Sequence, residues 1–489
     1  MDVTDERGPM ITNDSVIRSQ AYFDGAWHAT PRTFEVIHPG TQRPIGAVAD
    51  CTADDARRAI DAADEALKAW RNVNPYQRGQ VLRRWHDLMF EHKEQLARLM
   101  TLEMGKPITE TRGEVHYAAS FVEWCAEEAS RIGGERVPSR FDHKRGFTRS
   151  EPVGIVYAVT PWNFPAGMIT RKAAPALAAG CVMILKPAEQ SPMTALYLAE
   201  LWLQAGGPPN TLQVLPTNDA PAFSAPFMAD ERVRKLTFTG STAVGRLLYG
   251  QAARTLKRVS LELGGHAPFL IFADADLDRA AREVVASKFR NSGQTCISTN
   301  RVYVQRDVAA PFTEILKRLT GELVLGDPLL DSTGVGPVVE QAGLDKVRAQ
   351  VEDALTRGAT AVTGGEVHEG LYFQPTVLTG VHPDSLILRE ETFGPVAPVV
   401  VFDTEEEGLA LANASEYGLA AYAYTRDLSR AFRVAEALEY GIVGINDGVP
   451  SAAAPQMPFG GMKNSGVGRE GGHWGLEEYL EVKYVSLGL

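Results

Sequence analysis

The stretch "VGIVYAVTPWNFP", residues 153–165, is a short apolar run that stops at a turn bounded by prolines. Its valine, isoleucine and tyrosine side chains are typical of a buried strand. Three similar runs follow, each separated from the last by a helical pattern: "CVMILKP" (181–187), "LQVLP" (212–216) and "KLTFTGS" (235–241). Strands that alternate with helices form βαβ units. The region therefore predicts a parallel sheet, with ligands bound at the carboxyl ends of its strands.

A second alternation of strands and helices begins near Val259. It includes "APFLIFADADL" (267–277), followed by a helical segment, and later the strand-like runs "YFQPTVLTGV" (372–381), "APVVVF" (397–402) and "AYAYT" (421–425). The chain has 489 residues, which is too long for one ordinary core. We therefore expect an α/β protein of two or three domains.

Three long helical segments precede the first sheet, at about 52–70, 75–105 and 109–132, and Thr52 is placed to cap the first. The last residues, "GLEEYLEVKYVSLGL" (475–489), end in the alternating pattern of an exposed strand. An unpaired strand edge favours association with another chain. We therefore expect this strand to pair with another subunit.

Composition narrows the class of protein. Net charge is −12, which argues against a nucleic-acid partner. The four cysteines form no CxxC pair and no HExxH occurs, so we expect no disulfide framework and no metal site. The N-terminus lacks a secretory signal, and the longest apolar stretch, 173–185, is too short to span a membrane. We expect a cytoplasmic protein without membrane contact.

Three side chains are candidates for covalent chemistry. Cys296 lies in "NSGQTCIST" (291–299); a free thiol has a pKa near ~8.5, so a nucleophilic role needs help from elsewhere in the chain. Glu262, among apolar neighbours, would have a raised pKa that suits a general base. Asn163, between two prolines, could hold an amide donor toward an oxyanion. Taken singly, a core cysteine, an ion-paired glutamate and a turn asparagine are the alternatives.

Two further motifs favour a nucleotide. Lys186 and Glu189 follow a predicted strand, where they could bind ribose hydroxyls. Gly240, Ser241 and Gly245 lie at a helix start, where free N–H groups bind phosphate. The pattern is not GxGxxG, so a glycine-tolerant turn is an equal alternative at this point.

The motifs "PWNFP", "KPAE", "FTGST", "LELGG", "GQTC", "EETFGPV" and "PFGGMKNSGVGRE" occur in that order. Together they resemble the NAD(P)-dependent aldehyde dehydrogenase superfamily over nearly the full length. "KFRNSGQTC" and "EALEYGIVGIN" are most similar to the succinate-semialdehyde dehydrogenases. The resemblance implies a Rossmann-like NAD-binding domain (1–126 and 147–258), an α/β catalytic domain (259–469), and a small β oligomerisation element (127–146 and 470–489). It also implies a dimer or a tetramer, and we expect a homotetramer.

The resemblance implies a mechanism. Cys296 would attack the aldehyde, and Asn163 with the Cys296 N–H would hold the oxyanion. After hydride transfer leaves a thioester, Glu262 would activate the hydrolytic water. Lys172 and Glu470 match positions linked to proton transfer around Glu262.

The resemblance also implies binding residues. Glu189 should repel a 2′-phosphate, so NAD is favoured, with NADP use left open. Arg171 and Arg290 match arginines that bind the far carboxylate of the substrate; an internal ion pair is the alternative for each. Expected cofactor residues are Trp162, Lys186, Glu189, Gly240, Ser241, Gly245, Glu391 and Phe393, and expected substrate residues are Arg171, Arg290, Ser451 and Phe459.

Two departures from the succinate-semialdehyde type leave the aldehyde open. Ser298 stands where relatives often carry a second cysteine, so we expect no redox switch there. The loop "NDGVPSAAAPQMPFGG" (446–461) is about two residues longer than in that type, which keeps sulfolactaldehyde and glutarate semialdehyde as alternatives.

Two other classes of protein are alternatives to this interpretation. A CoA-acylating enzyme would not need Glu262, and a non-catalytic NAD-binding oligomer would not need Cys296.

Overall fold

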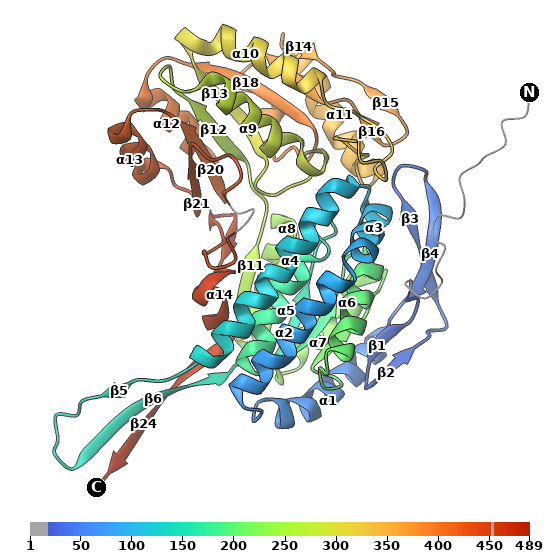
Figure 1. The fold of residues 1–489 in the computed structure, drawn as a ribbon, viewed down its shortest axis with the longest axis vertical. Coiled ribbons are helices and arrows are strands. Elements are labelled where there is room, and N and C mark those ends of the chain that lie inside the picture. Colours follow the sequence, from blue (N-terminus) through green and yellow to red (C-terminus); the bar gives the residue numbers. More distant parts are fainter. Residues whose placement is uncertain (1–17, 451–453) are drawn as a thin grey trace, which may run out of the picture.

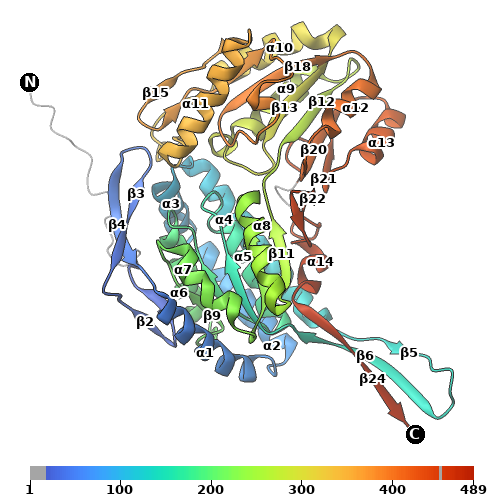
Figure 2. The same cartoon turned by 180° about the vertical axis from the view of Figure 1, so that it is seen from behind.

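The protein is built on two sheets with parallel strands at their centres, which lie one above the other along the long axis of the molecule (Figures 1 and 2). This computed structural model describes residues 18–450 and 454–489. Within those residues, no helix has both the length and the apolar character needed to cross a membrane. The predicted α/β class with parallel strands is confirmed.

The first sheet has the strand order β2-β1-β9-β8-β7-β10-β11-β23. Its five central strands are parallel, and the helices that connect them are α5 to α8. The expected ligand motifs follow the carboxyl ends of these strands, so they meet at one edge of the sheet. The strands are β1 (Ala21–Phe23), β2 (Ala26–His28), β7 (Ile155–Val159), β8 (Val182–Lys186), β9 (Leu212–Val214), β10 (Val233–Thr239), β11 (Arg258–Glu262) and β23 (Gly466–Val467). The helices are α5 (Gly167–Ala179), α6 (Pro192–Gln204), α7 (Ala220–Ala229) and α8 (Thr242–Ala252).

Four helices precede the five parallel strands of this sheet, and α2 and α4 pack on α5 (Figure 1). Thr52 caps α1 with a reciprocal hydrogen bond to Asp55, as its position predicts. The prediction of one helix over 75–105 is wrong, because the chain breaks at His92, whose φ is −100° and ψ is 21°. His92 Nδ1 lies 2.6 Å from the Tyr197 hydroxyl, a tertiary contact that carries no local sequence signal. The helices are α1 (Ala53–Trp70), α2 (Pro75–Glu91), α3 (Lys93–Met104) and α4 (Ile108–Glu128).

The second sheet has the order β14-β17-β18-β13-β12-β20-β21. All its neighbouring strands are parallel except β14 and β17. Its strands are β12 (Ala267–Ile271), β13 (Thr299–Gln305), β14 (Thr360–Thr363), β17 (Thr376–Thr379), β18 (Val396–Phe402), β20 (Ala420–Tyr424) and β21 (Ile442–Ile445). Its helices are α9 (Leu277–Phe289), α10 (Arg306–Gly321), α11 (Gln341–Thr356), α12 (Glu405–Asn413) and α13 (Leu428–Ala437). Smaller elements are β3 (Thr33–His38), β4 (Arg43–Ala49), β15 (Val367–Glu369), β16 (Tyr372–Phe373), β19 (Tyr417–Gly418), β22 (Met462–Lys463) and α14 (Gly472–Glu477).

A third sheet projects from the body as an arm that carries the C-terminus (Figures 1 and 2). It contains β5 (Arg136–Val137), β6 (Lys144–Pro152) and β24 (Leu480–Gly488), in the order β24-β6-β5. The expectation that the last strand is unpaired within its own chain is wrong, because β24 pairs with β6 along its whole length. β6 also crosses the expected domain boundary at residue 147. The domain division itself stays a prediction.

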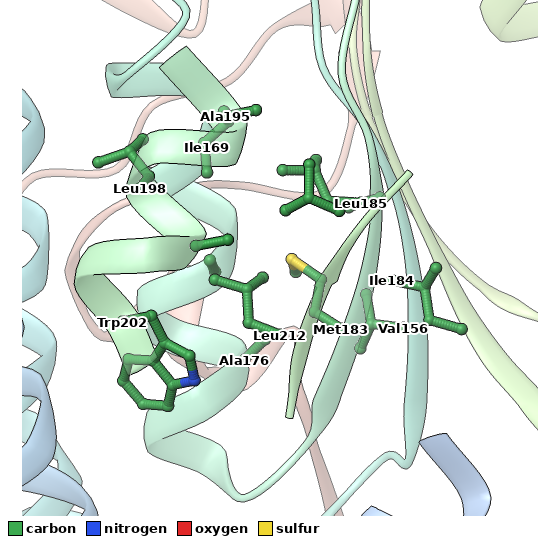
Figure 3. Close-up of a cluster of buried hydrophobic side chains, with 14 of the residues drawn as sticks. Val156, Ile169, Ala176, Met183, Ile184, Leu185, Ala195, Leu198, Trp202 and Leu212 are labelled. Atoms are coloured by element: carbon green, nitrogen blue, oxygen red, sulfur yellow. The ribbon is translucent and has the colours of Figure 1, made fainter. Parts of the chain in front are cut away.

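Trp202, on α6, belongs to the buried core that packs against the first sheet (Figure 3). The Trp202 side chain is fully buried, and its Nε1 donates to Thr211 Oγ1 at 3.0 Å. Its ring makes edge contacts with Trp70 and Trp85, at centroid distances of 6.1 and 5.4 Å. Such contacts add to the free energy gained from burial.

We expect Trp202→Ala to lower the free energy of unfolding by about 3–5 kcal/mol, because it leaves a cavity that the surrounding side chains cannot fill. Phe432→Ala is the control, since Phe432 is exposed on α13 and should cost less than about 0.5 kcal/mol. Denaturant titration of both variants measures the difference. Equal shifts of the two midpoints would contradict this view of the core.

Candidate active site

Cys296 lies where two cavities meet, between the two sheets. One cavity, of about 250 Å³, is lined by side chains from α4, α5 and the loop before β13. The other, of about 370 Å³, runs along the strand ends of the first sheet. Cys296 and Met168 line both. A thiol at this junction can react with a molecule in one cavity while a second molecule occupies the other.

The backbone around Cys296 is held in an unusual conformation. Asn291 and Ser292 have φ values of +51° and +56°, and Gly293 follows at +75°. A Cβ on Gly293 would lie 2.1 Å from the Gly394 carbonyl oxygen, so only glycine fits there. Left-handed backbone is unfavourable for residues with side chains, and it persists where the surroundings enforce it. The loop that carries Cys296 is therefore rigidly placed.

The Cys296 thiol is a weak acid in this setting. Burial raises its pKa to about 12, while the charge of Arg171 works in the opposite direction. The sulfur is therefore protonated at neutral pH in the chain on its own. Activation requires a base or a change of surroundings when ligands bind.

The Asn163 amide faces the Cys296 loop. Its Nδ2 donates to the main-chain carbonyl oxygen of Gln294 at 3.0 Å, and the main-chain carbonyl oxygen of Asn163 accepts from Asn291 Nδ2 at 3.0 Å. Asn163 and Cys296 line the same cavity. The amide has a second N–H beyond the one given to Gln294, so a donor remains for an oxygen that forms beside the sulfur.

Glu262 ends β11 next to a buried cluster of charges. Glu470 accepts from Arg171 Nε at 2.5 Å and from Lys172 Nζ, and Lys172 Nζ also donates to Thr237 Oγ1 at 3.1 Å. Among the described residues, Glu262 Oε2 has no hydrogen-bond partner. Burial raises the pKa of Glu262 well above its usual value, and the Glu470 carboxylate adds to the rise. A carboxylate of raised pKa with an open oxygen suits proton abstraction.

Five of the eight expected cofactor residues line the larger cavity: Trp162, Gly240, Ser241, Glu391 and Phe393. Glu391 Oε1 accepts from the Gly265 N–H at 2.9 Å, and the Trp162 and Phe393 rings make an edge contact at 5.6 Å. The cavity thus combines a fixed carboxylate, an aromatic wall and the start of α8, which fits a dinucleotide.

The other three expected cofactor residues lie outside this cavity. Gly245 lies within α8, where a Cβ would stand 2.3 Å from Leu263 Cδ2, so its lack of a side chain serves packing. Lys186 Nζ and Glu189 Oε2 form an ion pair at 3.0 Å. Glu189 lines a neighbouring groove that shares Val339 and Glu340 with the larger cavity.

The two arginines that are expected to bind the substrate differ in their hydrogen bonds and ion pairs within the chain. The Arg171 side chain is 1% exposed, stacks 4.0 Å from the Phe459 ring centroid, and gives its Nε to Glu470 and a terminal nitrogen to Tyr117. The alternative of an internal ion pair therefore holds for Arg171. Arg290 forms no ion pair with any residue in 18–450 or 454–489, and its Nε has no hydrogen-bond partner there. Both arginines and Phe459 line the smaller cavity, and Ser451 lies outside the described residues.

Sequence reasoning missed the residues that α4 and the segment before it bring to the smaller cavity. These are Lys106, Glu110, Glu114 and Tyr117. A signal was available, because three charged residues recur at four-residue spacing in "GKPITETRGEVHY" (105–117). No group of three His, Cys, Asp or Glu side chains suited to a metal ion occurs in the part of the chain that the structure describes.

Comparison with known proteins gives a consistent result. The chain is 50% identical to a succinate-semialdehyde dehydrogenase [NADP(+)] of Escherichia coli, over 98% of this chain and 100% of that one. It is 49% identical to a glutarate-semialdehyde dehydrogenase of Pseudomonas putida and 46% identical to a 3-sulfolactaldehyde dehydrogenase of the same species, each covering 98% of this chain and 99% of the relative. A crystal structure of succinate-semialdehyde dehydrogenase from Burkholderia pseudomallei superposes with a TM-score of 0.96 at 47% identity, over 98% of this chain and 100% of that one.

The sequence description of the aldehyde dehydrogenase family matches residues 27–485, nearly the whole chain. The predicted fold, the NAD(P) requirement and the oxidation of an aldehyde to its acid are those of this family, as the order of the motifs indicated. The chain belongs to the aldehyde dehydrogenase family.

Proposed function

We propose that the protein oxidises a small anionic aldehyde, with succinate semialdehyde as the first candidate. The observation that carries this proposal is the Arg290 guanidinium, which lines the cavity leading to Cys296 and forms no ion pair within the described residues. This side chain is half-buried, and a guanidinium pairs well with a planar carboxylate or another oxyanion. A substrate with an anionic end supplies that partner.

The shape of the smaller cavity supports a short substrate. Its volume of about 250 Å³ is below the ~300–1,000 Å³ typical of drug-sized ligands. Phe164, Met168, Ile297 and Phe459 give this cavity apolar walls beside its charged side chains. A chain of a few carbons between an aldehyde and an anion fits this combination of surfaces.

Sulfolactaldehyde and glutarate semialdehyde are the second candidates. Relatives of nearly equal identity are named for each of them. A sulfonate also pairs with a guanidinium, and the longer loop at 446–461 could accept a different head group. Three of its residues, 451–453, lie outside the described residues, and Ser451 stays a predicted substrate contact.

The residues support a covalent mechanism. Cys296 Sγ attacks the aldehyde carbon, and the Asn163 amide with the Cys296 N–H stabilises the oxyanion. Once the hydride has left for the cofactor and a thioester remains on Cys296, Glu262, as the carboxylate, takes a proton from the water that hydrolyses it. Lys172 and Glu470 border Glu262, and the Glu470 carboxylate, hydrogen-bonded to Lys172, is proposed to accept that proton from Glu262. The smaller cavity holds the substrate tail, which keeps the carbonyl beside the sulfur.

The larger cavity is proposed to hold the dinucleotide. Glu391, which the Gly265 N–H orients, is placed for a ribose hydroxyl, and Ser241 with the start of α8 for the pyrophosphate. The chemistry that NAD(P) supplies when bound is acceptance of a hydride, which turns the adduct on Cys296 into a thioester. Glu189 favours NAD, because its carboxylate would repel a 2′-phosphate, while Lys186 offsets part of that repulsion.

We propose that the chain works as a homotetramer in the cytoplasm. β24 is the outer strand of the projecting sheet, and its Val482, Tyr484 and Leu487 are exposed. A free edge with apolar side chains favours a partner subunit. All four cysteines are free thiols, in keeping with a reducing compartment.

The mechanism predicts distinct failures for two variants. We expect Cys296→Ala to abolish aldehyde oxidation while NAD binding stays measurable by fluorescence titration, because the nucleophile is lost and the larger cavity is kept. Glu262→Gln should form NADH in a single burst and then stall, with the acyl group trapped on Cys296 and detectable by mass spectrometry. Steady turnover of either variant at the wild-type rate would contradict the assignment.

The two arginines should respond differently to removal. We expect Arg290→Leu to lower kcat/KM for succinate semialdehyde by about 100-fold, or about 2.7 kcal/mol, and for butanal by less than about threefold. Arg171→Leu should lower both, because it breaks the ion pair with Glu470 beside the base. If Arg290→Leu lowered kcat/KM equally for the two substrates, the Arg290 side chain would have a structural role and would not recognise the anion.

The pKa of Glu262 gives a signed pH dependence. Because the carboxylate form is the base, the rate of deacylation should rise with pH through the raised pKa. Glu470→Gln removes the negative charge that adds to this rise, and it leaves Lys172 and Arg171 as uncompensated positive neighbours. The pKa of Glu262 should fall, so the acid limb of the single-turnover deacylation profile should move to lower pH. A move to higher pH would contradict the charge balance described here.

A further inference from the structure

Three charged side chains in the first turns of α4 and just before it lie beside the smaller cavity; two of them are buried and Glu110 is half-buried. We call Lys106, Glu110 and Glu114 the α4 charge cluster; all three line the cavity that ends at Cys296. The side chains of Lys106 and Glu114 are each 1% exposed, and they form an ion pair of 2.5 Å. Buried charges are stable only where they gain partners, so the partners of this cluster indicate its role.

The Lys106–Glu114 pair holds the main chain of the loop that carries Asn163. Lys106 Nζ donates to the Asn163 carbonyl oxygen at 2.7 Å. Glu114 Oε1 accepts from the N–H groups of Ala166 and Gly167 at 3.0 and 3.2 Å. Both ends of the turn are thus fixed to one ion pair, which sets the position of the Asn163 amide.

Glu110 holds the second catalytic loop. Its Oε2 accepts from the Asn291 N–H at 2.8 Å, at a residue whose φ is +51°. Asn291 Nδ2 then donates to the carbonyl oxygens of Asn163 and Gln294, at 3.0 and 3.2 Å. The Asn163 carbonyl oxygen is therefore shared by Lys106 and Asn291, and it joins the loop of the oxyanion donor to the loop of Cys296.

Most of the bonding capacity of Lys106 is used within the chain. Its ammonium has three donor positions. It gives one to Glu114 and one to Asn163, and it lies 3.6 Å from the Phe164 ring centroid. Its charge is neutralised by Glu114, whereas Arg290 in the same cavity has no such partner among the described residues. The contacts of Lys106 therefore hold the Asn163 loop in position.

We propose that Lys106, Glu110 and Glu114 are positioning residues that fix the Asn163 amide against the Cys296 loop. The inference rests on the function proposed above for Asn163 and Cys296. A donor that moves away from the developing oxyanion weakens binding of the transition state more than binding of the substrate. Loss of the cluster therefore lowers kcat for charged and uncharged aldehydes alike, and leaves the dissociation constant of NAD unchanged.

The test compares Lys106→Met with wild type, using succinate semialdehyde and butanal. We expect kcat to fall by about 10- to 100-fold for both substrates, with NAD affinity kept. Lys257→Met is the matched control, because Lys257 Nζ also donates to two main-chain carbonyl oxygens, those of Asp230 and Val233, each at 2.7 Å, outside the catalytic loops. It should lower the melting temperature and keep kcat within about twofold. A loss confined to succinate semialdehyde, or no loss, would overturn the proposal.

A second pair of variants avoids the buried ion pair. Glu110→Gln keeps an oxygen acceptor for the Asn291 N–H, whereas Glu110→Ala removes it. With butanal we expect the Gln variant to keep most of the wild-type kcat, and the Ala variant to lose about tenfold. Equal kcat values for the two variants would overturn the proposal even if Lys106→Met fails to fold. A wild-type protein that oxidises no aldehyde would overturn the proposed function itself, before any variant is compared.

Discussion

The close contact between Gly265 and Cys296 is the constraint on which the active site depends. Gly265 lies between β11 and β12, where the chain passes from the first sheet to the second. A Cβ at this position would stand 2.3 Å from the Cys296 carbonyl oxygen. The Gly265 N–H also orients Glu391, in the larger cavity. One residue without a side chain thus brings Cys296, Glu262 at the end of β11 and the larger cavity into one place.

The charged residues around Cys296 fall into two groups: those that are paired within the chain and those that have an atom without a hydrogen-bond partner. Lys106 with Glu114, and Arg171 and Lys172 with Glu470, are paired within the chain. Pairing of this kind holds loops and helices but leaves little capacity for a ligand. Within residues 18–450 and 454–489, an oxygen of Glu262 and Arg290 Nε lack hydrogen-bond partners. These open groups are the ones to which we assign the base and the recognition of the anion.

The strands and the motifs at their ends could be predicted from the sequence, because they depend on local patterns of apolar residues. The strands β7, β8, β10 and β12 follow from short apolar runs, and the ligand motifs follow their ends, as the parallel fold requires. Contacts between distant residues could not be predicted in this way. The ion pair of Arg171 joins residues 299 positions apart, and His92, where the helix breaks, contacts Tyr197 on another helix. β24 pairs with β6 although more than 300 residues lie between them in the sequence.

The most direct test of the account is kcat/KM for NADH formation by the wild-type protein, with succinate semialdehyde, glutarate semialdehyde, sulfolactaldehyde and butanal measured side by side. The account predicts that one anionic aldehyde exceeds butanal by about 100-fold or more, because the charged end contributes about 2.7 kcal/mol to binding of the transition state. The anion that is favoured identifies the head group that Arg290 receives. Equal values for butanal and the anionic aldehydes would contradict the assignment of the smaller cavity to an anionic substrate.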